Sequence, residues 1–368
     1  MKRVAESQSI ALRNIGRVCI EEVFRLGVLR DGVRLTTSDI RLPILGQVIP
    51  RIELIITAPE SSKKITVRIN QESPFTFDGN SLRATINGEG LEVACIQYLN
   101  EDRAPTGIYD FGILRENGMR SFVFDYHTYC AYSCNFCFKE SEWEVLSIQQ
   151  ANTSNYKANH AQCLRYVEEH ADEFRTNYDI VWLCTGSITN ETLELERHQK
   201  MARALRGVGY TEGIYVSQVI PPGILRDRGR RRDYMHALKD SGVSRFNSGV
   251  EVVGQDYRKR YIHGYKGTIT FEDFLAVFED AGEIFGGHGV GSCLLAGLEP
   301  SENTMFGLEQ MGRAGVAPAP TVFTPFVVKQ QSIPFMYDLD ELIEVHLKFN
   351  EIIEKYGLPE FSGVFSLA

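Results

Sequence analysis

The feature that most constrains the fold is an alternation of apolar runs and amphipathic segments from about residue 119 to 328. The apolar runs read as buried strands, and each following segment has apolar residues at helical spacing. The strand candidates are 121–126, 179–186, 213–220, 244–253, 289–297 and 321–328. The helix candidates between them are 162–174, 191–207, 230–242, 270–286 and 303–315. Strands that alternate with helices pair in parallel through right-handed crossovers, so we expect an α/β fold.

The number of strand and helix units indicates how far the sheet closes. Six units are fewer than the eight of a complete barrel, which predicts an open, partial (β/α)6 TIM-like barrel. Residues 1–116 differ, because one helix candidate at 17–29 precedes short β-rich runs, and they predict a smaller N-terminal α+β domain. We therefore expect an accessory domain at 1–116, a barrel at 117–335 and a helical extension at 336–368. The mixed Pro, Gly and charged stretch at 101–118 is the predicted linker.

Composition limits the classes of partner. The 48 acidic and 39 basic side chains give a net charge of -9, which offers no general reason to expect nucleic acid or an anionic membrane. No run of eighteen apolar residues and no signal-like start occur, so a cytoplasmic enzyme is expected. The basic run 226–232 is either a solvated helix start or a docking surface for an acidic electron donor or anionic substrate.

Three of the eight cysteines fall within eight residues. Cys130, Cys134 and Cys137 have the spacing C-x3-C-x2-C and directly follow the first strand of the alternating region. Loops after parallel strands build the active sites of α/β sheets. Three thiolates suit a cubane iron–sulfur cluster with one iron left open, to which a cofactor could bind. A zinc site that adds His127 as fourth ligand is the alternative, and the five scattered cysteines read as buried thiols.

The segment CAYSCNFC resembles the signature of the radical S-adenosylmethionine (SAM) superfamily, C-x3-C-x-aromatic-C, and the partial barrel of that family resembles the predicted one. The resemblance implies a [4Fe-4S] cluster on the three cysteines, SAM as the second cofactor, and Phe136 against the adenine of SAM. It also implies an external reductant such as flavodoxin or ferredoxin. The acid on the fourth strand, followed by the Tyr- and Arg-containing segment DYRKRYIHGYKG, makes the chain most similar to the biotin-synthase-like, small-molecule branch. The lack of a second cysteine cluster in the C-terminal region argues against the peptide-modifying branch.

Further cofactor-binding positions follow from the resemblance. The Gly-rich motif that ends the second strand corresponds to Thr185, Gly186 and Ser187, although its usual acidic residue is missing here. The fourth strand ends in Ser248 and Glu251, similar to the positions that hold the ribose and amino-acid ends of SAM. The fifth strand offers Val290 and Gly291 for the adenine, or for tight strand packing.

Other candidates lie near these strand ends. Basic residues after the fourth strand are candidates for the SAM carboxylate or, alternatively, a solvated helix face; they are Arg258, Arg260 and Lys266. Polar residues at other strand ends are predicted to line the pocket; they are Ser217, Thr324, Tyr126 and His127.

The resemblance implies cleavage of SAM to a 5′-deoxyadenosyl radical that takes hydrogen from a small organic substrate, either amino-acid-like or a cofactor or natural-product precursor. Three alternatives stay open. These are a peptide or protein substrate, transfer of the aminocarboxypropyl group of SAM, and a non-catalytic zinc or iron–sulfur protein.

Overall fold

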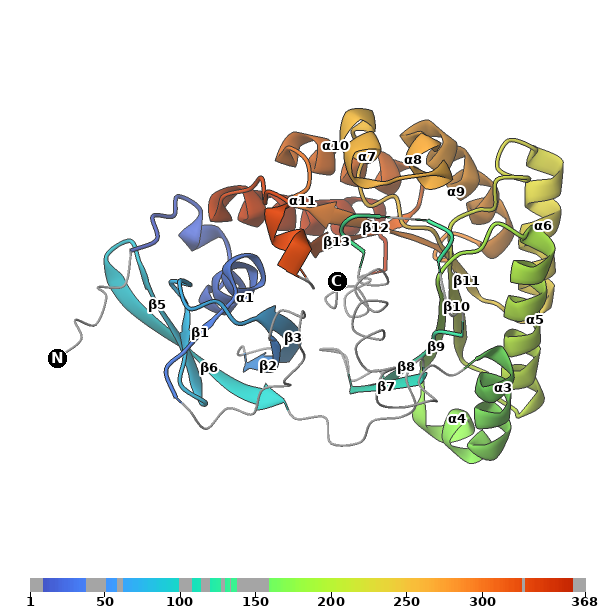
Figure 1. The fold of residues 1–368 in the computed structure, drawn as a ribbon, viewed down its shortest axis with the longest axis horizontal. Coiled ribbons are helices and arrows are strands. Elements are labelled where there is room, and N and C mark those ends of the chain that lie inside the picture. Colours follow the sequence, from blue (N-terminus) through green and yellow to red (C-terminus); the bar gives the residue numbers. More distant parts are fainter. Residues whose placement is uncertain are drawn as a thin grey trace.

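The computed structural model describes residues 9–37, 51–57, 62–98, 108–113, 120–126, 130–132, 134–137, 159–325 and 328–359. These residues form two sheets, each with its own helices, that lie beside one another (Figure 1). No helix in this part of the chain combines the length and the apolar character that crossing a bilayer requires.

The larger sheet carries the predicted barrel. Its strands are β7 (Ile108–Ile113), β8 (Arg120–Phe124), β9 (Ile180–Cys184), β10 (Gly213–Ser217), β11 (Arg245–Asn247), β12 (Val290–Ala296) and β13 (Ala317–Val322). They are ordered β13-β12-β11-β10-β9-β8-β7, and every neighbouring pair from β8 to β13 is parallel. Six parallel strands in chain order form the expected open half-barrel, so the predicted fold class is confirmed.

Two strands differ from the sequence-based expectation. Strand β7 pairs antiparallel with β8, although its residues lie inside the predicted linker. We therefore propose that the boundary between the two domains falls before Ile108. Strand β13 ends at Val322, whereas the sixth strand was expected at 321–328. Its prolines, Pro318 and Pro320, weaken a sequence-based strand assignment, but β13 pairs only with β12 among the described strands and such an edge tolerates proline.

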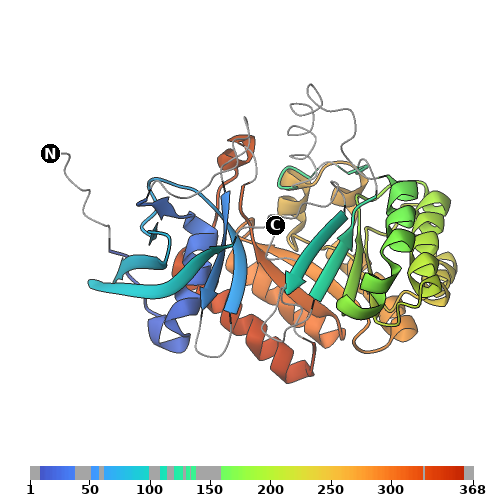
Figure 2. The same ribbon diagram turned by 90° about the horizontal axis from the view of Figure 1, so that it is seen from below.

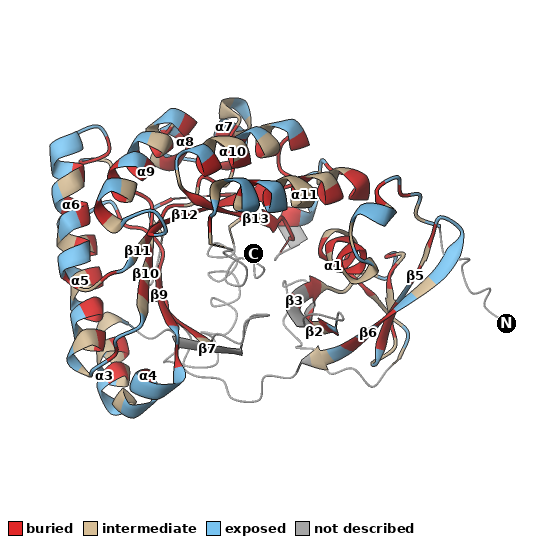
Figure 3. Cartoon of the chain, turned by 180° about the vertical axis from the view of Figure 1, so that it is seen from behind, coloured by how far each residue is buried: buried red, intermediate tan, exposed pale blue. Residues whose placement is uncertain are grey.

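Helices cover the outer face of this sheet (Figures 1 and 2). They are α3 (His160–Glu169), α4 (Ala171–Asn177), α5 (Glu191–Gly207), α6 (Arg228–Asp240), α9 (Phe271–Phe285) and α10 (Ser301–Arg313). Two short helices, α7 (Gln255–Tyr261) and α8 (Tyr265–Thr268), follow β11, where a helix face was one alternative for the basic residues. The buried residues of these helices face the strands and the exposed ones point to the outside (Figure 3).

The N-terminal part combines a mixed sheet with one helix, as expected for an α+β domain. Its strands are β1 (Arg34–Leu35), β2 (Arg51–Thr57), β3 (Ser62–Arg68), β4 (Thr76–Phe77), β5 (Ser81–Ile86) and β6 (Glu89–Tyr98). Their order is β1-β4-β5-β6-β2-β3, and helices η1 (Ile15–Arg17) and α1 (Ile20–Asp31) precede them. Phe24 of α1 packs edge-on against Phe75, with ring centroids 5.5 Å apart.

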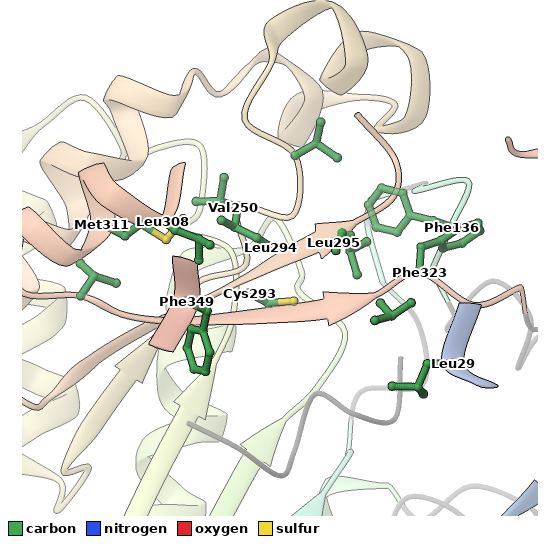
Figure 4. Close-up of a cluster of buried hydrophobic side chains, with 14 of the residues drawn as sticks. Leu29, Phe136, Val250, Cys293, Leu294, Leu295, Leu308, Met311, Phe323 and Phe349 are labelled. Atoms are coloured by element: carbon green, nitrogen blue, oxygen red, sulfur yellow. The ribbon is translucent and has the colours of Figure 1, made fainter. Parts of the chain in front are cut away.

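Several hydrogen bonds join the N-terminal part to the barrel. The hydroxyl of Thr324, just after β13, donates to the backbone oxygen of Leu29 at 3.2 Å, and Figure 4 shows Leu29 close to Phe323. Asp340, at the start of α11 (Leu339–Tyr356), accepts hydrogen bonds from the backbone N–H groups of Arg13 and Asn14, both at 2.9 Å. The last helix thus packs outside β13, as expected, and also holds the N-terminal segment.

Candidate functional site

One pocket lies at the carboxyl ends of the parallel strands. It is lined by the loop after β8, by residues at the ends of β9 to β12 and by Phe323 after β13. The lining residues are Cys130, Tyr132, Cys134, Phe136, Cys137, Cys184, Thr185, Gly186, Ser187, Ser217, Gln218, Val219, Asn247, Gly249, Glu251, Lys266, Cys293, Leu295 and Phe323. The three cysteines of the C-x3-C-x2-C motif therefore face one cavity with residues from five strands.

Backbone hydrogen bonds fix the cysteine loop over the barrel. The N–H of Ala131 donates to the oxygen of Ser187 at 2.8 Å, and the N–H of Asn135 donates to the oxygen of Tyr261 at 2.8 Å. The N–H of Cys137 bonds the oxygen of Cys134 at 2.9 Å. The loop is thus tied to the end of β9 and to the end of α7, so the thiols are held on a rigid frame.

Gln330 also holds this loop, and the sequence analysis missed it. It lies in helix η2 (Val328–Ser332) and is 1% exposed. Its amide Nε2 donates to the backbone oxygens of Asn135 and Cys137, at 3.1 and 3.2 Å. A buried glutamine that bonds two carbonyls of the cysteine loop fixes the direction in which that loop runs.

Phe136 and the residues after β9 line the pocket. Phe136 is buried and lines the pocket between the second and third cysteines; Figure 4 shows it beside Leu295 and Phe323. Thr185, Gly186 and Ser187 also line the pocket. The Ser187 hydroxyl accepts the N–H of Val219 at 2.9 Å, so it braces the loop after β10.

Glu251 and Lys266 form a buried ion pair in the pocket wall. Lys266 Nζ lies 2.5 Å from Glu251 Oε2, with side-chain exposures of 6% and 19%. Burial is the largest influence and would lower the pKa of Lys266, but the charge and hydrogen bond of Glu251, together with the nearby Cys134 and Cys130, hold this pKa above its usual value. Glu251 also has a φ of 64°, in the left-handed region that a residue with a Cβ rarely adopts. Such strain persists only where the surroundings enforce it, and it gathers at functional sites.

Arg258 corrects the sequence-based expectation. It is fully buried and does not line the pocket. Its guanidinium donates to the backbone oxygens of Ile269 at 2.9 Å, Val250 at 2.6 Å, Val252 at 2.7 Å and Lys266 at 2.9 Å. Four of its five N–H groups are thereby used to hold the segment after β11, so Arg258 is a structural residue rather than a carboxylate ligand.

Ser248, Val290 and Gly291 also lie outside the pocket lining. Successive side chains of a strand point to opposite faces. Because the residue before Ser248 faces the pocket, Ser248 itself faces away from it. That preceding residue is Asn247, which the sequence analysis missed. Ser217, by contrast, lines the pocket as predicted.

The remaining candidates have other contacts. The Tyr126 hydroxyl bonds His198 Nδ1 behind the strand ends, and the guanidinium of Arg260 lies 5.5 Å from the ring centroid of Tyr257. His127 lies outside the described residues. Within the part of the chain that is described, no three His, Cys, Asp or Glu side chains are grouped closely enough to hold a single metal ion.

The basic run of 226–232 is paired within the protein. Arg228, Arg231 and Arg232 all contact the carboxylate of Asp280 on α9, which is 1% exposed. Arg230 pairs with Glu191. These arginines therefore join the start of α6 to its neighbouring helices, which favours the helix start over a docking surface, although Arg231 is buried rather than solvated.

A half-barrel with three cysteines at the carboxyl end of its first parallel strand defines a class of iron–sulfur enzyme, and sequence comparison identifies the family. The pattern of the radical SAM superfamily matches residues 126–305. Residues 126–305 thus belong to the radical SAM superfamily. Membership implies a [4Fe-4S] cluster and SAM as its cofactors.

Individual proteins that resemble the chain have low sequence identity to it or match only part of it. The bacteriochlorophyllide c C-7(1)-hydroxylase of Chlorobaculum limnaeum is 31% identical over 123 residues, which is 33% of this chain and 31% of that protein. The chain thus spans about a third of the length of this relative. Among solved structures, methylornithine synthase (PylB) has a TM-score of 0.46 at 15% identity, covering 63% of this chain and 62% of its own. The hydrogenase maturase HydG of Carboxydothermus hydrogenoformans has a TM-score of 0.43 at 13% identity, covering 64% and 51%.

Proposed function

We propose that Cys130, Cys134 and Cys137 hold the [4Fe-4S] cluster and that the enzyme acts on a small organic molecule bound in the barrel lumen. The observation that carries this proposal is the shared pocket, in which the three thiols face the polar ends of β9 to β11. When bound and reduced, the cluster and SAM supply a 5′-deoxyadenosyl radical that removes hydrogen from a substrate. An external reductant of the flavodoxin or ferredoxin type would provide the electron.

The chain offers one zwitterion site for the amino-acid end of SAM. The acidic residue of the usual motif after β9 is missing, but Glu251 and Lys266 place one carboxylate and one ammonium in the pocket wall. We infer that Glu251 receives the SAM amino group and Lys266 its carboxylate. Each buried charge would then gain an additional partner of opposite sign at little desolvation cost, because the pair is already buried.

The adenine of SAM would lie against Phe136. This aromatic ring is buried in the wall of the same pocket, beside Leu295 and Phe323 (Figure 4). Three apolar side chains provide a flat, dry surface on which a heteroaromatic ring can pack. Thr185, Gly186 and Ser217 lie on the neighbouring strands, where their polar groups can reach a bound cofactor.

A small substrate is supported by the shape of the lumen. Trp182 and Tyr215 form an edge-to-face pair inside the barrel, with centroids 5.0 Å apart, one interior layer below the pocket residues. The pocket is therefore closed at the bottom. A lumen that is closed at one end can hold an entire small molecule, whereas an extended peptide needs a groove that is open at both ends.

The test is the product of SAM cleavage. Protein prepared without oxygen is reconstituted with iron and sulfide, reduced with dithionite and given SAM, and the nucleosides are separated by chromatography. We expect 5′-deoxyadenosine from the wild type and from the control Cys95→Ala, whose cysteine is buried in the N-terminal sheet. We expect none from the triple Cys130, Cys134 and Cys137 to Ala variant. Methylthioadenosine instead would indicate aminocarboxypropyl transfer and would refute the radical proposal.

A further inference from the structure

Three polar side chains form one row across the floor of the pocket. Cys184 on β9 pairs in register with Ser217 on β10, and Ser217 pairs in register with Asn247 on β11. Residues in register on parallel strands point to the same face of the sheet. All three line the pocket, so a thiol, a hydroxyl and a carboxamide stand side by side on three adjacent strands.

Aromatic side chains lie directly below this row. One interior step below it lie Trp182 and Tyr215, and the guanidinium of Arg245 is 4.8 Å from the ring centroid of Tyr215. One step above the row lie Gly186, Val219 and Gly249, and the two glycines have no side chains to fill the space. The geometry leaves open volume above the row and closes it below, so a molecule that enters the lumen comes to rest on these side chains.

Within the row, Asn247 is the residue whose polar atoms lack hydrogen-bond partners in the described structure. It is 2% exposed, and neither its Nδ2 nor its Oδ1 has a hydrogen-bond partner in the described part of the protein. A buried amide without hydrogen bonds is costly and is rare in native structures. A bound molecule that satisfies both atoms would offer an acceptor to Nδ2 and a donor to Oδ1.

The charges around the pocket determine whether that group is neutral or ionised. Among the described lining residues, Glu251 and Lys266 carry the formal charges, and they pair with each other at 2.5 Å. The row itself is uncharged. A carboxylate placed on the row would have no cation of its own and would face the Asn247 carbonyl oxygen, which is unfavourable in a buried site.

We propose that Cys184, Ser217 and Asn247 recognise a neutral group of the substrate that carries both a donor and an acceptor, such as a carboxamide or a lactam. This inference rests on the proposed function and deepens it. It excludes a free amino-acid head group at this position, since the zwitterion site of the pocket is assigned to SAM. The amide of Asn247 donates to the carbonyl of the substrate and accepts from its N–H.

The test measures binding rather than turnover. Reconstituted enzyme with the oxidised cluster and bound SAM is titrated with butyramide, 2-pyrrolidinone and butyrate, and dissociation constants are obtained by ligand-observed NMR. We expect the two neutral probes to bind at least about tenfold more tightly than butyrate. Asn247→Leu should weaken the neutral probes by about tenfold or more, whereas the exposed control Asn177→Leu should not change them.

Several results would overturn the inference. These are butyrate binding as tightly as butyramide, no saturable binding of either neutral probe, or an Asn247→Leu variant that weakens SAM instead of the probes. If Asn247→Leu does not fold, Asn247→Asp keeps the shape, removes the donor and should also weaken both neutral probes. Failure of the proposed function can be distinguished from failure of this inference. If the proposed function is wrong, the same preparation gives no 5′-deoxyadenosine.

Discussion

Lys266 Nζ lies 2.5 Å from Glu251 Oε2 in the wall of a pocket that also contains Cys134. The carboxylate belongs to a residue with a left-handed backbone, and the ammonium is almost completely buried. A strained residue and a buried charge pair are both costly features. Their presence beside the cysteine loop is explained if the pair binds the charged end of SAM.

Replacing either member of the pair should therefore weaken SAM selectively. We expect Lys266→Met and Glu251→Gln each to raise the SAM dissociation constant by about tenfold or more. Binding of 5′-methylthioadenosine, which lacks the amino-acid end, should stay unchanged, as should SAM binding to the exposed control Arg260→Met. Calorimetric titration of the reconstituted enzyme measures both ligands. Equal weakening of the two ligands would show that the pair only stabilises the fold.

Glu194 should make the stability of the protein depend on pH. It is fully buried on α5, and burial raises its pKa to about 8, although the N–H of Ile188 donates to it at 3.4 Å. The groups that face it include the hydroxyls of Tyr126, Tyr132 and Tyr234, which are neutral at these pH values. In the unfolded chain the pKa is about 4.3.

The folded state thus holds a proton that the unfolded state has lost between pH 4.3 and 8. The contribution of Glu194 to the free energy of unfolding is fully present below the pKa of the unfolded chain. It is lost as the pH rises toward 8, with a slope on the order of 1 kcal/mol per pH unit. We expect urea unfolding at pH 5.5 and 7.5 to show this decrease in the wild type and in Glu196→Gln, an exposed position on the same helix. Glu194→Gln should lack it, and the same slope in that variant would contradict the assignment.

Asp280 should contribute to stability through the arginines that surround it. Its carboxylate is 1% exposed and contacts Arg228, Arg231 and Arg232; burial would raise its pKa, but these partners hold that pKa below its usual value. Asp280→Asn leaves the buried guanidinium of Arg231 without its counter-charge and should cost about 3 kcal/mol in the free energy of unfolding.

The matched control for this prediction is Glu283→Gln. Glu283 pairs with Arg228 and Arg232 from a half-exposed position, so the change should cost less than about 1 kcal/mol. Urea denaturation compares the two variants. Equal losses would mean that burial of the Asp280 carboxylate does not matter.

Gln330 should affect retention of the cluster. Loss of its two hydrogen bonds in Gln330→Leu leaves the buried carbonyls of Asn135 and Cys137 without this donor, at a cost of about 1 to 2 kcal/mol. We expect a chelator to remove iron from this variant about tenfold faster than from the wild type. The decrease in visible absorbance measures this rate. The exposed neighbour Gln331→Leu should lose iron at the wild-type rate, and an identical rate in both variants would assign Gln330 no positioning role.

The sequence predicted the barrel because its signals are local. Apolar runs and helical spacing repeat along the chain, and each unit is recognisable by itself. Where local signals conflict, the prediction was displaced or absent. Pro318 and Pro320 made the start of β13 look unlike a strand, so the sixth strand was predicted too late in the chain. The Pro- and Gly-containing stretch before 118 looked like a linker, so β7 was not predicted. Pairing at a sheet edge depends on neighbours that are distant in sequence.

The site was predicted most completely where a motif is contiguous, although Ser217, Glu251 and Lys266 were also predicted and line the pocket. The three cysteines, Phe136 and residues 185–187 all line the pocket, but Gln330 contacts residues 195 and 193 positions away and gives no local signal. Ser248 was named and Asn247 was missed, because a three-residue strand does not reveal which face is interior. Arg258 looked like an anion ligand, because sequence cannot show that its N–H groups are used by backbone carbonyls.

The central claim is that three cysteines hold a cluster with one iron open to SAM. Electron paramagnetic resonance of the anaerobically reconstituted, reduced protein tests it directly, together with iron and sulfide analysis. We predict about four iron and four sulfide per chain and a cluster signal that changes shape when SAM is added. A signal that SAM leaves unchanged, or a protein that retains zinc and no iron, would contradict the claim.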